Sequence, residues 1–248
     1  MILFVIIKHL FHFRYRSNLS LVEYSNISEM FHLTRTPRER YNFTQLSTPP
    51  LRQYLADVVD YYKLALSSDE PYIKYISFYH IMEYFYDEVF KKKMVSDLRN
   101  KITSPDFTYK NDDKVYEIAK FVNNRMRMDS KSGLGDEAES LKFVLMEYVP
   151  IEELRARIAT IDSTAETYYQ TSKVVFCNAP SIAWSDVQGV YTQLCKRIYA
   201  TRNSLIHSKS GRKHELYHPY KDEPILRKEI PLVKAVAELI IINSSSVL

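Results

Sequence analysis

The sequence predicts a mainly α-helical protein with a small β-containing appendage at its N-terminus. Three observations support this class: apolar residues recur at helical spacing over most of the chain after residue 50, there are only 4 glycines among 248 residues, and Leu, Ile, Tyr, Glu and Lys are abundant. The apolar content of 46% is enough for a substantial core. The length allows one large domain, or one domain with a small addition.

Residues 1–48 differ from the rest of the chain. Residues 1–7 form an apolar run that is too short to cross a bilayer and lacks the features of a signal peptide, so a buried strand is the better interpretation. Residues 11–16 alternate apolar and charged side chains, as a strand with one wet face does. The Ser/Thr/Pro stretch at 47–50 then marks a boundary. We therefore expect an appendage at 1–48 and a helical domain at 49–248.

Helical spacing predicts six helical segments in the second region. They cover residues 51–66, from 71 to about 90, 112–126, about 136–169, 186–208 and 231–242. The segment at 71–90 is apolar nearly all round, which is typical of a central, buried helix. A stripe of His80, Glu83 and Asp87 interrupts it; we interpret this as a polar seam rather than as a set of metal ligands.

Composition sets limits on the function. The net charge of +4 permits a polyanionic partner but does not require one. Cys177 and Cys195 stand far apart, without metal-ligand spacing, so neither a structural zinc nor any other cofactor is expected. With no long apolar window, the sequence predicts a cytoplasmic protein with reduced thiols.

The residues with the most chemical content are Arg202 and His207, near the end of the segment at 186–208. Because a helix advances about 100° per residue, Asn203 and His207 share one face, with Tyr199 one turn before them. Arg202 lies about 140° from His207 on the same wheel. Convergence of the two on one phosphate therefore needs a helix end near His207, a long reach by Arg202, or a second copy of the chain.

These residue types suit RNA cleavage without a metal. The 2′-OH of RNA attacks the adjacent phosphate if one group takes its proton, a cation holds the phosphate and an acid protonates the leaving oxygen. His207 has the pKa range for proton transfer, Arg202 offers a bidentate donor, and Asn203 can orient either. The spacing alone is weak, because an Arg at a helix end is often only a favourable dipole contact and such a His is often a surface residue.

A basic, irregular segment follows the motif. It contains Lys209, Arg212 and Lys213. Two readings stay open for it: an RNA-contacting loop beside the site, and solvated surface.

The run at 197–209, with Arg202, Asn203 and His207, resembles the signature of HEPN domains: an Arg, a polar residue, and a His four to six residues after the Arg. The aromatic run at 79–85 and the closing segment at 224–242 also resemble those of large bacterial HEPN-like proteins. The likeness covers about residues 50–245. The section at 91–180 is longer than the corresponding part of a minimal HEPN domain, so we expect extra helices there.

The resemblance implies an α-helical bundle that forms a homodimer with the two motifs facing each other. It implies a metal-independent endoribonuclease of a toxin–antitoxin or antiphage system, with an RNA substrate and an antitoxin or defence protein as partner. Arg202 and His207 would be catalytic, Asn203 auxiliary and Glu83 a supporting residue. Some HEPN domains are inactive, so a non-catalytic module that binds protein, nucleotide or RNA is the alternative.

Overall fold

The computed structural model describes residues 51–131, 137–206 and 216–247, and these are mainly α-helical, as the sequence predicts. The expected appendage at 1–48 lies outside the described residues. A two-stranded antiparallel sheet joins β1 (Arg52–Gln53) to β2 (Ser246–Val247). It ties the start of the described chain to its end.

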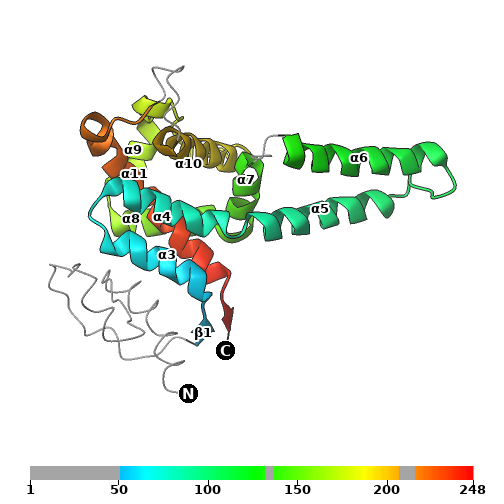
Figure 1. Cartoon of the computed structure of the whole chain (residues 1–248), viewed down its shortest axis with the longest axis horizontal. Coiled ribbons are helices and arrows are strands. Elements are labelled where there is room, and N and C mark those ends of the chain that lie inside the picture. Colours follow the sequence, from blue (N-terminus) through cyan, green and yellow to red (C-terminus); the bar gives the residue numbers. More distant parts are fainter. Residues whose placement is uncertain (1–50, 132–136, 207–215, 248) are drawn as a thin grey trace.

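The body of the molecule is built on α4 (Pro71–Glu83), which packs against both α3 (Ala56–Ser67) and α11 (Pro219–Asn243) (Figure 1). Pro71 occupies the first turn of α4, where its missing N–H costs nothing. Aromatic and aliphatic side chains cover several sides of α4, and Tyr75, Phe78 and Tyr79 are fully buried. The prediction of a central, buried helix here is confirmed.

Further helical elements complete the body. They are α7 (Glu137–Tyr148), α8 (Ile151–Ile161), α9 (Ala165–Thr171), the 3-10 turn η1 (Val175–Cys177) and α10 (Val190–Ile206). All three of α7, α8 and α9 pack against α11, and α7 also contacts α5 and α10. The helix expected over about 136–169 is divided among α7, α8 and α9, because Pro150 precedes α8 in extended backbone and separates it from α7.

Other predicted boundaries also differ, and α10 begins at Val190 rather than at residue 186. The first helix begins at Ala56 rather than at residue 51, because Arg52 and Gln53 pair with β2. The expected helix at 71–90 is interrupted after Glu83, and a second helix starts at Tyr86. The last helix begins at Pro219, twelve residues before the expected start at Pro231, so Pro231 lies inside it. Proline usually ends a helix, but here the buried apolar face of α11 outweighs that preference.

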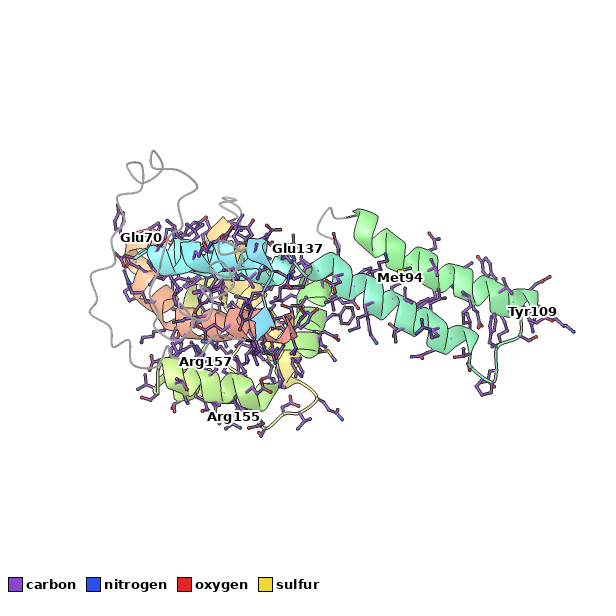
Figure 2. The ribbon with its side chains drawn as sticks, turned by 90° about the horizontal axis from the view of Figure 1, so that it is seen from below. Glu70, Met94, Tyr109, Glu137, Arg155 and Arg157 are labelled. Carbon is purple, nitrogen blue, oxygen red and sulfur yellow. The ribbon has the colours of Figure 1, made fainter. Side chains whose placement is uncertain are left out.

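The break after Glu83 starts a long helical hairpin. It consists of α5 (Tyr86–Ile102) and α6 (Asp112–Lys131) and projects from the body (Figure 1). Figure 2 shows Met94 part-way along the hairpin and Tyr109 at its far end. At its base, α5 packs on α7, where Lys92 forms an ion pair with Glu147.

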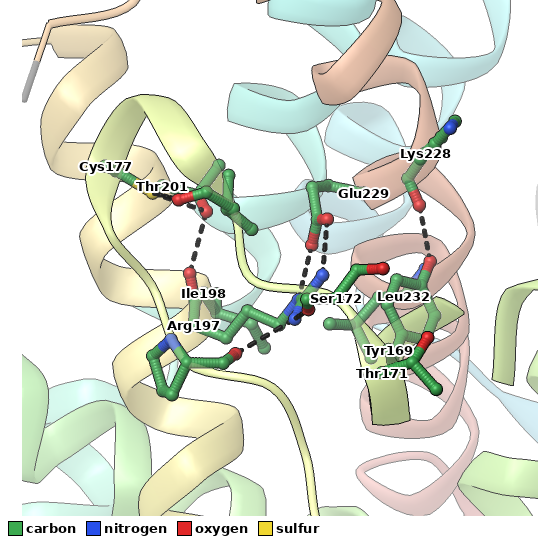
Figure 3. A network of polar contacts seen from close by, with 12 residues as sticks. Tyr169, Thr171, Ser172, Cys177, Arg197, Ile198, Thr201, Lys228, Glu229 and Leu232 are labelled. Atoms are coloured by element: carbon green, nitrogen blue, oxygen red, sulfur yellow. Dashed lines mark hydrogen bonds and ion pairs between the residues drawn. The ribbon is translucent and has the colours of Figure 1, made fainter. Parts of the chain in front are cut away.

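A buried ion pair fastens α10 to α11. The Arg197 guanidinium donates from Nε and Nη2 to the two carboxylate oxygens of Glu229, at 2.8 Å each, and both side chains are inaccessible to solvent (Figure 3). Nη1 donates to the carbonyls of Ser172, at 2.7 Å, and Pro180, at 2.9 Å. Because a buried charge is costly unless it is fully paired, this arrangement is structural and fixes the loop before α10.

Candidate functional site

The candidate site centres on Arg202, which α10 carries into the junction with α4 and α7. Its Nη2 lies 2.8 Å from Glu83 Oε1 on α4, and its Nη1 lies 3.3 Å from Glu137 Oε2 at the start of α7. Nη1 also donates to Asn203 Oδ1 at 3.3 Å, and the guanidinium lies 5.1 Å from the Tyr79 ring centre. The site therefore joins three helices through one cation.

The local sequence explains why Arg202 turns inward. Its neighbours Thr201, Ser204 and Leu205 are buried, so the face of α10 that carries them packs against the body over the last turns of the helix. Arg202 lies at the edge of that apolar side, as the helical wheel predicts, and is only 9% exposed. A guanidinium at such an edge needs anionic partners, which α4 and α7 supply.

Glu83 links Arg202 to a histidine. While Oε1 accepts from Arg202, Oε2 lies 2.7 Å from Nδ1 of His80, one turn earlier on α4. Burial would raise the pKa of Glu83, but the hydrogen bond with His80 and the positive charge of Arg202 outweigh it and hold this pKa below its ordinary value. The carboxylate is therefore ionised at neutral pH. The imidazole is 40% exposed and lies 5.1 Å from the Tyr61 ring, which leaves one edge accessible.

Two opposite effects act on the pKa of Arg202. Burial lowers the pKa of its guanidinium, but the neighbouring Tyr79, Glu137 and Glu83 raise it above the ordinary value. Burial raises the pKa of Tyr79, whose hydroxyl accepts a hydrogen bond from Tyr86 at 2.9 Å, so this phenol stays neutral. Arg202 Nε is buried and has no acceptor within the described residues. The guanidinium thus holds two carboxylates, while its Nε donor has no acceptor among the described residues.

The structure brings together some of the residues predicted from sequence. Both Asn203 and Glu83 contact Arg202. Tyr199 lies one turn before Asn203 on α10 and packs, partly buried, against the core. The predicted catalytic partner His207 and the predicted RNA-binding residues lie outside the described residues. The latter are Lys209, Arg212 and Lys213.

Sequence reasoning missed two contributors to the site. Glu137 is 65 positions before Arg202, and no local pattern connects them. Tyr79 belongs to the segment at 71–90 that the sequence predicts to be buried; its ring is buried, but it also lies against the guanidinium. The helical spacing of His80 and Glu83 was a usable signal, and the two do form a polar pair at one turn.

The described part defines a class: a helical protein with a partly buried Arg–carboxylate–His cluster between two helices of its body. Comparisons with protein-family models, with curated proteins and with solved structures found no match.

Within residues 51–131, 137–206 and 216–247, no three His, Cys, Asp or Glu side chains lie close enough together to form a metal site. Among the same residues, no helix combines the length and apolarity needed to cross a membrane.

Proposed function

We propose that the protein is a metal-independent endoribonuclease of the HEPN type that acts as a toxin or antiphage effector. One observation carries the proposal: Arg202 of the Arg–polar–x3–His motif meets Glu83 of the aromatic helix at 2.8 Å, with His80 on the other carboxylate oxygen. The resemblance in sequence gave Glu83 as a supporting residue of the motif. The HEPN-like helical bundle belongs to the same proposal.

Each residue has a role in this reaction. His207 takes a proton from the 2′-OH or gives one to the 5′ oxygen, and Arg202 holds the charge that develops on phosphate. Asn203 positions the guanidinium through its 3.3 Å contact. Because cleavage needs both a base and an acid, His80, oriented by Glu83, supplies a second imidazole beside Arg202.

A second copy of the chain completes the site in this proposal. Arg202 and His207 diverge by about 140° on a straight helix, so one helix does not direct both toward a single phosphate. Two motifs that face each other across a two-fold axis supply two of each residue to one cleft. The RNA backbone then lies between the two copies of α10, and the basic segment with Lys209, Arg212 and Lys213 contacts its phosphates.

A specific observation favours a second candidate function, a non-catalytic helical module that binds a protein, a nucleotide or RNA. Glu83 and Glu137 already neutralise Arg202, at 2.8 Å and 3.3 Å. A guanidinium held in this way stabilises the junction of α4, α7 and α10 without touching any substrate. Under this alternative, binding survives substitution at His207 and no RNA is cut.

The deciding experiment is cleavage of RNA by the purified full chain in EDTA, with the product ends analysed. The proposal expects 2′,3′-cyclic phosphate ends, and a fall of about 100-fold or more in rate for His207→Gln. Glu153→Gln is the control, because this carboxylate is exposed on α8. If the wild-type chain leaves RNA intact, or if His207→Gln cuts at the wild-type rate, the ribonuclease proposal fails.

A further inference from the structure

The guanidinium of Arg202 is largely covered by the protein's own side chains. Nη2 donates to Glu83 Oε1 at 2.8 Å, and Nη1 lies 3.3 Å from both Asn203 Oδ1 and Glu137 Oε2. Nε is buried, and the Arg202 side chain as a whole is only 11% exposed. A phosphate oxygen that binds this guanidinium therefore has to replace one of the groups that now face it.

The charges around Arg202 also oppose the approach of a second anion. Two carboxylates, those of Glu83 and Glu137, already face the single positive charge of Arg202. Burial raises the pKa of the neighbouring Tyr79, so its phenol is neutral at neutral pH. Because charges interact strongly where water is largely excluded, a phosphate that approaches Arg202 is repelled until one carboxylate moves away.

Of the two carboxylates, Glu137 is the one that phosphate can replace. Glu83 is fixed by a second contact, because its Oε2 lies 2.7 Å from Nδ1 of His80. The contact of Glu83 with Arg202 is also the shorter one, at 2.8 Å against 3.3 Å for Glu137. The side chain of Glu137 is 21% exposed, so rotation about its own bonds carries the carboxylate into water while α7 stays in place.

We propose that Glu137 inhibits the ribonuclease site by occupying the position that a substrate phosphate takes on Arg202. Without RNA, the Glu137 carboxylate faces Nη1; when RNA binds, a phosphate oxygen replaces it and Glu137 turns toward solvent. Glu83 remains on Nη2 and keeps the guanidinium in place. Since only a fraction of the molecules has Glu137 turned away, the apparent affinity for RNA is reduced by that fraction. The inference rests on the proposed function, because it assigns a regulator to the same site.

The test compares the full chain with its variant Glu137→Gln in cleavage and in binding of a short RNA. Glutamine has nearly the size of glutamate but no charge, so it competes only weakly with phosphate. Glu137→Gln should lower KM for cleavage about fivefold or more. The dissociation constant of the same RNA with 2′-O-methyl groups, which lacks the attacking hydroxyl and stays intact, should fall by a similar factor.

Glu147→Gln is the matched control. Glu147 lies on the same helix, about 15 Å farther along, and forms an ion pair with Lys92 of the hairpin. Its substitution removes the same charge and loosens the contact of α7 with the hairpin, but it leaves the surroundings of Arg202 unchanged. RNA affinity that rises equally in both variants overturns the proposal, because a general loss of negative charge then explains the gain.

The remaining outcomes separate this inference from the proposed function. If the wild-type chain and Glu137→Gln both leave RNA intact, the ribonuclease proposal fails and this inference fails with it. If the wild type cuts RNA, and a folded Glu137→Gln has an unchanged or higher KM, only the inhibitory role of Glu137 is overturned. Circular dichroism checks the fold. If Glu137→Gln does not fold, Glu137→Asp decides: it keeps the charge but is one methylene group shorter, so it should lower KM by a smaller factor.

Discussion

Arg202 Nη2 lies 2.8 Å from Glu83 Oε1, and this contact fixes one end of the α5–α6 hairpin to α10. Glu83 is the last residue of α4, directly before the break that starts the hairpin. Glu137, the second carboxylate on Arg202, is the first residue of α7, after the hairpin returns to the body. The guanidinium of Arg202 therefore binds a carboxylate at each end of the hairpin. The residue that we propose as catalytic thus also has a structural role.

Removing the charge of Glu83 should lower stability. We expect Glu83→Gln to reduce the free energy of unfolding by about 1–3 kcal/mol, because the acceptor of Arg202 loses its negative charge in a partly buried site and the hydrogen bond becomes weaker. Glu137 limits the loss, since it still faces Arg202. Urea unfolding followed by circular dichroism measures the change.

The matched control for this variant is Glu153→Gln. Glu153 is an exposed carboxylate on α8, and an exposed substitution of this kind changes stability by about 0.5 kcal/mol or less. Equal effects of the two substitutions would show that the contact between Arg202 and Glu83 contributes nothing to stability.

The same pair predicts a pH dependence. The pKa of Glu83 is lower in the folded chain than its ordinary value of 4.5, so its contribution to stability is fully present above pH 4.5 and is lost as the pH falls through the folded value. The stability difference between wild type and Glu83→Gln should therefore be constant near neutral pH and shrink in acid. Unfolding curves from pH 3 to pH 7 measure it, and a difference that grows in acid contradicts the assignment.

Much of the helical content follows from local pattern. The apolar spacing of α4 and the proline at its first turn predict a central helix, and the structure confirms it. The helix at 112–126 is also confirmed, although α6 continues to Lys131. The interruption after Glu83 could not be predicted, because residues 84–90 are as apolar as those before them. It arises where α5 leaves the body toward α7.

The candidate site was less predictable than the helices. The pairing of His80 with Glu83 is local and follows from their spacing of three. The contacts of Arg202 with Glu83 and Glu137 join positions 119 and 65 residues apart, which only the packing of α10 on α4 and α7 decides. The buried pair of Arg197 and Glu229 could not be predicted for the same reason. In the sequence, Arg197 is only one more basic residue of α10.

Arg197 should be more sensitive than any exposed arginine. We expect Arg197→Met to cost about 3–5 kcal/mol, because it leaves Glu229 charged and buried with no cation opposite it. Arg197→Lys should recover only part of this, since an ammonium does not reproduce the two parallel hydrogen bonds or those to Ser172 and Pro180. Combining Arg197→Met with Glu229→Leu should restore stability relative to Arg197→Met alone. Thermal unfolding of the four proteins, wild type included, tests this order.

Arg202→Lys separates the structural role of Arg202 from its proposed catalytic role. The lysine keeps a positive charge opposite Glu83 and Glu137, so we expect a modest loss of stability, about 1–2 kcal/mol. It loses the planar fork that binds two phosphate oxygens at once, so RNA cleavage should fall by about 100-fold or more. Rates are measured well below the melting temperature and are corrected for the unfolded fraction of the variant. If cleavage by Arg202→Lys falls only in proportion to its unfolded fraction, Arg202 acts solely in holding the hairpin to the body, and the non-catalytic module becomes the better description of the protein.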